Sequence, residues 1–324
     1  MENKNNIRIA YMGTPDFAVA GLKALVEKGY NVVGVVTMPD KPAGRGMKLQ
    51  HSPVKEYALA HHLPLLQPEK LKDPDFLESL RSWKADLQIV VAFRMLPEIV
   101  WNMPRLGTFN LHASLLPQYR GAAPINWAII NGETETGVTT FFLTHEIDTG
   151  HILLQERIPI TDTDNAGTIH DQLMNRGAGL VIQTVDQIMA GELHSTPQDK
   201  LIQDKSRLRM APKIFKETCE VNWNQEIKKV YDFIRGLSPY PTAWADLSAP
   251  SGDLLSLKIF ETEKRFESHS LIPGTLVSDG KSFIDIACTD GFIRLLLIQQ
   301  AGKKKMSVVE FLRGIRWERG GKLL

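Results

Sequence analysis

Residues 107–117 read Gly-Thr-Phe-Asn-Leu-His-Ala-Ser-Leu-Leu-Pro, a β-prone stretch that runs into a proline-containing loop. If residues 108–111 form a strand, Asn110 and His112 point to the same side of it, because side chains alternate along a strand. A carboxamide and an imidazole would then share one pocket at a strand end. For either residue alone, the ordinary interpretation is a polar side chain that caps a strand.

The segments around this stretch alternate between strand-like and helix-like patterns. Strands are predicted at 7–11, 31–37, 87–93, 109–112 and 138–143, and helices after Pro15, at 75–83 and at 124–130. This alternation predicts an α/β fold with a Rossmann-like, mostly parallel sheet covered by helices. Ligands of such sheets bind at the carboxyl ends of strands, where Met12, Phe93, His112 and residues 145–148 fall.

The length of 324 residues predicts two domains. A long helix at 166–190 would close a first domain of residues 1–190, and the polar segment 191–212 is predicted to be a linker. Residues 213–324 would form the second domain. There a helix near 225–235 precedes short strands at 242–247, 255–260 and 282–287, which indicates a small β-barrel of a type that the residues leave open.

The composition is ordinary for a soluble globular protein, with 43% hydrophobic and 23% charged residues and a formal net charge of +1. Basic residues slightly outnumber acidic ones from residue 211 onward, which permits a nucleic-acid partner without requiring one. The two cysteines, Cys219 and Cys288, argue against a disulfide framework or zinc site and fit a reducing cytoplasm, where we expect the chain. We expect no secretory signal and no membrane-spanning segment.

Several common site motifs are missing from the sequence. Gly13 lies outside any Gly-x-Gly-x-x-Gly pattern, and no Gly-x-x-x-x-Gly-Lys-Ser/Thr occurs, so neither a dinucleotide nor a nucleoside triphosphate is predicted. Ser114 lies two positions from His112 and outside a Gly-x-Ser-x-Gly motif, so we interpret it as structural rather than as a nucleophile. The remaining histidines have no metal-ligand spacing, and no metal is expected.

Three ordered blocks of the sequence resemble the folate-dependent formyltransferases. The family's catalytic signature combines Asn-x-His and Ser-Leu-Leu-Pro with a later Asp-Thr-Gly, which begins here at Asp148. The blocks Gly-Thr-Pro-Asp-Phe-Ala at 13–18 and Pro-Asp-Lys-Pro-Ala-Gly-Arg-Gly at 39–46 resemble the members that act on methionyl-tRNA. The resemblance extends over essentially the whole chain, and it implies that the second domain is an OB-like β-barrel.

The resemblance implies that a formyl group passes from N10 of 10-formyltetrahydrofolate to the amine of initiator methionyl-tRNA. An oxyanion develops in such a transfer, and Asn110 would stabilise it as a donor that stays neutral at every pH. His112, when protonated, would add a charged donor. Asp148 would favour that protonated form by its opposite charge and pass protons through a bound water.

The folate is expected at two strand ends and one later loop. The residues that the resemblance implies for it are Phe93, Arg94, Met95 and Leu96, then Ser114, Leu115, Leu116 and Pro117, and finally Ile147. Main-chain groups of the first segment would bind the pterin edge. The tRNA enzymes usually carry Ala-Tyr-Gly where this sequence has Ala-Phe-Arg, and the related glycinamide ribonucleotide formyltransferase has an arginine in much this region.

Residues 38–53 are rich in proline, glycine and basic side chains, and we predict a long loop without regular structure. A mobile cationic finger suits phosphates and bases, whereas the ordinary alternative is a solvated surface loop. The members that act on methionyl-tRNA carry this insertion and use it at the acceptor stem. We therefore expect Lys41 and Arg45, together with Gly13, Thr14 and Pro15, to bind the substrate.

Three other functions stay open on the sequence. They are a formyltransferase for a sugar-nucleotide amine, a hydrolase that releases formate from the same folate, and a non-catalytic tRNA-binding module. Arg45 argues against the first, and the complete set of Asn110, His112 and Asp148 argues against the last. The basic residues of 302–322 are compatible with phosphate contacts along a tRNA. We expect a monomer without a membrane partner.

Overall fold

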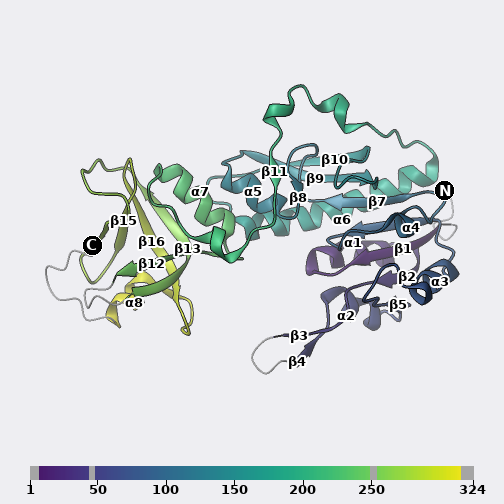
Figure 1. The fold of residues 1–324 in the computed structure, drawn as a ribbon, viewed down its shortest axis with the longest axis horizontal. Helices are drawn as coiled ribbons and strands as arrows, with labels where there is room; N and C mark the ends of the chain where they lie inside the picture. The colour runs from purple at the N-terminus through teal and green to yellow at the C-terminus, as the bar shows by residue number, and fades with distance from the viewer. Residues whose placement is uncertain (1–6, 44–47, 249–253, 315–324) are drawn as a thin grey trace. The chain divides into compact units, whose positions relative to one another are not determined.

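The computed structural model describes residues 7–43, 48–248 and 254–314, which form two compact units (Figure 1). Unit 1 takes in the described residues of Met1–Gly121, Thr136–Ile158 and His170–Met210. Unit 2 takes in those of Ala122–Glu135, Pro159–Ile169 and Ala211–Leu324. The linker at 191–212 and the domain limits on either side of it stay predictions.

Unit 1 is built on a seven-stranded sheet in the order β10-β9-β7-β6-β1-β2-β5. The strands are β1 (Arg8–Gly13), β2 (Asn31–Val36), β5 (Leu65–Leu66), β6 (Leu87–Val91), β7 (Thr108–His112), β9 (Glu135–Phe142) and β10 (Ile152–Pro159). The strands from β5 to β7 pair in parallel, whereas β9 is antiparallel to β7. The mostly parallel sheet predicted from the sequence is thereby confirmed.

Five helices belong wholly or mostly to unit 1: α1 (Asp16–Glu27), α2 (Pro53–Ala60), α3 (Pro74–Ser82), α4 (Glu98–Trp101) and α6 (Ala166–Ala190). Local chemistry explains how two of them begin. Asp73 accepts hydrogen bonds from the Asp75 and Phe76 main chain, and Ser52 accepts one from Lys55, with a proline at the first position of each helix. Both starts satisfy main-chain N–H groups that a helix end leaves open.

The alternation of side chains along the strands gives the sheet two apolar faces. One face carries Met12 and Val90 and packs against Phe76 and Leu80 of α3. On the other face, the Tyr11 hydroxyl donates to a carbonyl of α1. Helices therefore cover both faces, which leaves the strand ends and their loops to form a site.

Residues 38–53 are not wholly irregular, so that prediction was wrong. Strands β3 (Lys41–Ala43) and β4 (Lys48–Gln50) form an antiparallel ribbon in which Pro42 pairs with Leu49. Both strands of a two-stranded ribbon are edge strands. Proline has no N–H, and it is tolerated on an edge strand where that position faces away from the partner strand.

Unit 2 contains a six-stranded antiparallel sheet with the path β12-β13-β16-β15-β14, and β17 pairs with β16. Its strands are β12 (Ala243–Ser248), β13 (Leu254–Arg265), β14 (Leu276–Ser278), β15 (Ile284–Ala287), β16 (Phe292–Gln300) and β17 (Met306–Ser307). Its helices are α5 (Pro124–Ile130), α7 (Ile227–Leu237) and α8 (Val308–Arg313). Apolar residues of α7, including Ile227, Val230 and Ile234, pack in one core with strand residues.

The fold class expected from the sequence is confirmed: a Rossmann-like unit and a second, antiparallel β unit.

The remaining short elements of the described residues are β8 (Arg120–Gly121), β11 (Met210–Ala211), η2 (Gln198–Leu201), η3 (Lys205–Arg207) and η4 (Lys216–Cys219). Among the helices of the described residues, none is long and apolar enough to cross a membrane.

Candidate active site

Strand β7 places Asn110 and His112 on one face of the sheet. Asn110 lies between Val90 of β6 and Phe141 of β9, and His112 is paired with Thr139. Residues paired across neighbouring strands point to the same face, so both side chains lie on the face that carries Val90. His112 is 7% exposed and Asn110 is half-buried. The two side chains therefore lie on one face, as side-chain alternation predicted, and the pocket that they would share stays a prediction.

The hydrogen bonds of His112 define which ring nitrogen can act on a ligand. Its Nε2 lies 2.9 Å from the carbonyl oxygen of Tyr119. A carbonyl only accepts hydrogen bonds, so Nε2 must carry a proton. Nδ1 faces Oδ2 of Asp148 at 3.9 Å. That separation is too long for a direct hydrogen bond and suits a bridging water.

Asp148 reaches His112 by a route that the sequence did not predict. We expected it at the carboxyl end of a strand in a mostly parallel sheet. Because β9 is antiparallel to β7, Phe142 at its end lies beside Phe109 at the start of β7. The loop after β9 must turn back to bring the carboxylate to His112, and there the main-chain N–H of Gly121 donates to Asp148 Oδ2 at 2.9 Å.

Three non-glycine residues around this site have left-handed backbone conformations. The φ angles are +46° for Ala92, +61° for Tyr119 and +56° for Asp148. Ala92 follows β6, Tyr119 accepts the His112 hydrogen bond, and Asp148 supplies the carboxylate. Such conformations cost on the order of 1–3 kcal/mol each and persist only where surrounding contacts fix them. Their concentration here indicates a site whose geometry is held by its neighbours.

The loop after β7 is folded by its own polar groups. The Ser114 hydroxyl donates to the carbonyl of Gln118 at 2.7 Å, and Thr139 donates to the carbonyl of Ser114 at 2.6 Å. Gln155 donates to the carbonyl of Leu116 at 2.8 Å. Ser114 is fully buried and its proton is already used, which supports its interpretation as structural. Of the apolar loop residues, Leu116 is buried, whereas Leu115 and Pro117 are half-buried.

The segment after β6 presents apolar side chains unevenly. Met95 is 74% exposed and Ile147, in the Asp148 loop, is 63% exposed. Leu96 is buried in the core, and Phe93 is half-buried. Met95 and Ile147 are therefore the apolar side chains of the predicted folate set that are most open to a ligand.

Arg94 folds back onto the chain. Its guanidinium donates to the carbonyls of Pro68 and Glu69, the latter at 2.7 Å, and lies over the Phe93 ring at 5.6 Å. Burial lowers the pKa of Arg94 from its ordinary value. Its Nε is buried and has no hydrogen-bond partner within the described residues. The side chain thus ties the segment after β6 to the segment before α3.

The Gly-Thr-Pro motif at residues 13–15 connects the end of β1 to the start of α1. A Cβ atom on Gly13 would lie 2.5 Å from the Cβ of Ala18 and 3.0 Å from the carbonyl oxygen of Val91, so only glycine fits there. Pro15 precedes the first helical residue. The Thr14 hydroxyl oxygen is buried and has no partner within the described residues. The structure thus gives Gly13 a packing role beside the substrate role that the sequence predicted.

The base of the β3–β4 ribbon is held by charge. Asp40 accepts hydrogen bonds from Lys55 Nζ at 2.5 Å and from Gln67 Nε2 at 3.0 Å. The Lys55 hydrogen bond holds the pKa of Asp40 below its ordinary value. Lys41 is exposed on the ribbon, and Arg45 lies outside the described residues. The ribbon therefore leaves unit 1 from a fixed base.

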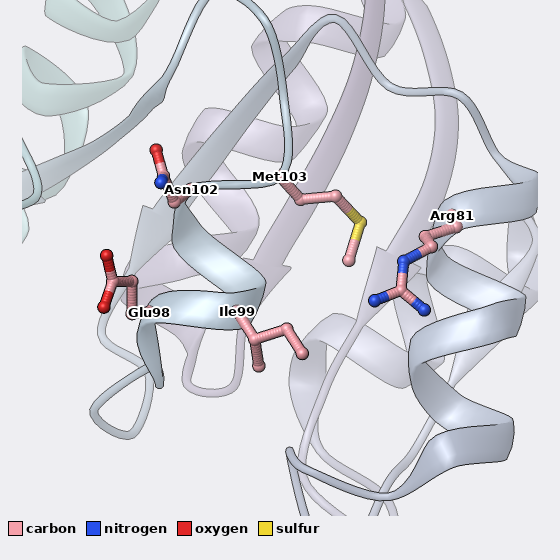
Figure 2. Close-up of a pocket in the computed structure, with 5 residues that line it drawn as sticks. All are labelled: Arg81, Glu98, Ile99, Asn102 and Met103. Carbon is pink, nitrogen blue, oxygen red and sulfur yellow. The ribbon is translucent and has the colours of Figure 1, made fainter.

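A cavity of about 410 Å³ lies at α3 and α4 (Figure 2). It is lined by Arg81, Glu98, Ile99, Asn102 and Met103. None of them belongs to the predicted site, so the cavity does not mark it. The part of the chain that the structure describes also contains no group of three or more His, Cys, Asp or Glu residues suited to a metal ion.

The structure adds site residues that sequence reasoning missed. Gln198 is 2% exposed and donates to the main chain of the Asp148 loop, and Arg120 donates to Gln198. Gln198 falls in the segment that was predicted to be a linker. A single glutamine among polar residues gives no periodic signal, so the sequence offered nothing to mark it.

Comparison with known proteins defines the class to which this fold and site belong. Residues 6–185 match the family model described as formyl transferase, and residues 213–316 match the formyl transferase C-terminal domain. The chain therefore belongs to the formyl transferase family, as its motifs predicted. A curated relative from Bacteroides fragilis, a methionyl-tRNA formyltransferase, is 66% identical over 311 residues, which cover 96% of each chain.

Two solved structures share the fold at low sequence identity. HypX from Aquifex aeolicus, in complex with tetrahydrofolic acid, has a TM-score of 0.64 at 19% identity, and the match covers 99% of this chain but 51% of HypX. An N-formyltransferase from Helicobacter canadensis, in complex with folinic acid and dTDP-3-aminofucose, has a TM-score of 0.64 at 18% identity. That match covers 93% of this chain and 100% of the Helicobacter canadensis chain.

Proposed function

We propose that this enzyme transfers the formyl group of 10-formyltetrahydrofolate to the α-amino group of initiator methionyl-tRNA. The products are N-formylmethionyl-tRNA and tetrahydrofolate, and the reaction serves translation initiation in the cytoplasm. The observation that carries the proposal is the meeting of His112 Nδ1 and Asp148 Oδ2 at 3.9 Å beside Asn110, in a chain 66% identical to a methionyl-tRNA formyltransferase.

Each of the three side chains would have a part in the transfer. The amine nitrogen attacks the formyl carbon, and the carbonyl oxygen becomes an oxyanion that the Asn110 amide stabilises. Because Nε2 of His112 is engaged by the Tyr119 carbonyl, Nδ1 is the ring atom that meets the reactants. The amine would pass a proton to Asp148 through a water. As the oxyanion collapses to a carbonyl, the bond from the formyl carbon to N10 breaks, and N10 takes up that proton from Asp148 through the same water.

The folate would lie against the ends of β6 and β7 and the Asp148 loop. Main-chain groups of 93–96 would bind the pterin edge, and the exposed Met95 and Ile147 would cover its apolar faces. The fold neighbour from Aquifex aeolicus that binds tetrahydrofolic acid supports a folate ligand for this fold. The loop residues of 114–117 would shape the pocket wall rather than contribute polar side chains.

The tRNA would be held by two cationic elements on one monomeric chain. Lys41, exposed on β3, and Arg45, which lies outside the described residues, would contact the acceptor stem. Gly13, Thr14 and Pro15, where β1 leads into α1, would also bind the substrate. The exposed lysines of 303–305 in unit 2 would contribute contacts to phosphates. The Asp40–Lys55 pair would set the direction in which the ribbon leaves unit 1.

A sugar-nucleotide amine is the second candidate acceptor, because the Helicobacter canadensis enzyme shares the fold. One assay separates the possibilities. Labelled formyl from 10-formyltetrahydrofolate is offered to methionyl-tRNA, to an amino-sugar nucleotide and to water, with the uncharged tRNA as control. We expect rapid label transfer to methionyl-tRNA alone. Preferential labelling of the sugar, or release as formate at an equal rate, would refute the proposal.

A further inference from the structure

Gln198 is buried within residues 191–210, a stretch whose other residues are exposed or half-buried. It is 2% exposed, whereas its neighbours Asp199 and Lys200 are exposed. Its carboxamide uses its full hydrogen-bonding capacity. Nε2 donates to the carbonyls of Asp148 and Gly150, both at 2.8 Å, and Oε1 accepts from Arg120 Nε at 3.0 Å and Nη2 at 2.7 Å. A buried amide saturated in this way specifies one arrangement of its neighbours.

The carbonyls that Gln198 binds flank a backbone turn that is under strain. Asp148 has a φ angle of +56°, and a Cβ atom on Gly150 would lie 1.6 Å from the carbonyl oxygen of Phe142. The left-handed residue costs on the order of 1–3 kcal/mol. Two hydrogen bonds from Gln198, at about 0.5–1.5 kcal/mol each, are of the right size to offset it. Without them, the turn that carries the carboxylate would lose two of the hydrogen bonds that hold its main chain.

Arg120 connects Gln198 to the other wall of the site. It lies between Tyr119, whose carbonyl accepts from His112 Nε2, and Gly121, whose N–H donates to Asp148 Oδ2. The hydrogen-bonded path therefore runs from His112 through residues 119–121 and Gln198 back to Asp148. Moving either wall changes the 3.9 Å gap between the imidazole and the carboxylate.

From this path we infer that Gln198 and Arg120 are positioning residues that fix the separation of His112 and Asp148 for formyl transfer. The inference rests on the proposed function. Neither residue touches the reactants; both act through the main chain that holds the catalytic pair. A displacement of about 1 Å in such a pair can lower a rate by about a hundredfold.

The test compares two glutamines of the same segment. Gln198→Glu keeps size and the bond to Arg120 but loses both donors and turns a negative oxygen toward two carbonyls. The exposed Gln203, changed to Glu, is the matched control with the same change in charge. We expect Gln198→Glu to lower kcat for formyl transfer about ten- to a hundredfold, with KM for both substrates within about threefold. Gln203→Glu should match the parent.

A double variant separates positioning from general damage. If Gln198 acts through Asp148, Gln198→Glu should add little loss in an Asp148→Asn background, whereas independent effects would multiply. Normal kcat for Gln198→Glu, or full multiplication in the double variant, would overturn the inference. If thermal melting shows that Gln198→Glu is unfolded, Arg120→Lys provides the same comparison. Lysine keeps the positive charge but cannot make the two hydrogen bonds that Arg120 donates to Gln198 Oε1.

The proposed function and this inference can fail separately. If the parent enzyme formylates another acceptor and not methionyl-tRNA, the proposed function is wrong. The same variants are then compared on the acceptor that the parent uses, and the pattern expected for Gln198 is unchanged.

Discussion

Replacing Asp148 with asparagine tests the electrostatic part of the mechanism. Asparagine keeps the shape and still accepts from the Gly121 N–H, but it removes the charge that faces His112 Nδ1 at 3.9 Å. The two side chains are only 8% and 16% exposed, so solvent screens the pair weakly. At an effective dielectric constant of about 20, opposite charges at this distance attract by up to about 4 kcal/mol. We take about 2–4 kcal/mol as the part lost, which corresponds to a rate decrease of about thirty- to a thousandfold.

The assay is single-turnover formyl transfer, with folate binding followed separately. We expect the transfer to slow while folate affinity stays nearly unchanged, because the substitution removes a charge beside His112 and leaves the folate segments in place. Thr149→Ala, which leaves the carboxylate in place, is the control. A variant with the parent's transfer rate would refute the electrostatic role.

Further outcomes can be measured on single substitutions. In the same transfer assay, Asn110→Ala should lower kcat about a hundred- to a thousandfold, and His112→Ala about a hundred- to ten-thousandfold. Folate affinity should stay nearly unchanged in both variants. Activity within a few fold of the parent would contradict these roles. Arg45→Ala should raise KM for methionyl-tRNA and leave slow formyl release to water intact; equal loss of both would place Arg45 in the chemistry instead. Burial raises the pKa of Cys288 to about 12, so the folded enzyme should not be alkylated there at pH 8, whereas the unfolded chain should; rapid labelling of the folded enzyme would show that this core is open.

Segments with dense local signals could be predicted from the sequence with nearly correct bounds. The apolar strand β6 and the helices α5 and α6 fall where residue periodicity placed them. Strand β10 was missed because Gln155, Glu156 and Arg157 interrupt its apolar pattern. Its residues are held in place by the neighbouring β9, which is a tertiary constraint that a local pattern does not carry.

The candidate site also combines features that the local sequence predicts with features that only the folded chain produces. The shared side of Asn110 and His112 follows from the two-residue repeat of one strand, so it could be predicted. The approach of Asp148 depends on the antiparallel direction of β9 and on a returning loop, and family resemblance rather than spacing identified it. Gln198 lies 50 positions from Asp148, and only the folded chain brings the two together.

The arginine at position 94, where the tRNA enzymes usually have glycine, has a structural explanation. A ligand that binds main-chain groups after β6 needs those groups unobstructed, and a long side chain there would be expected to interfere. In this chain the guanidinium is instead used by the carbonyls of Pro68 and Glu69. Because these hydrogen bonds hold the Arg94 side chain against residues 68–69, a folate could still bind the main-chain groups after β6. The departure from the family pattern therefore adds a tether beside the site and leaves the proposed chemistry of Asn110, His112 and Asp148 unchanged.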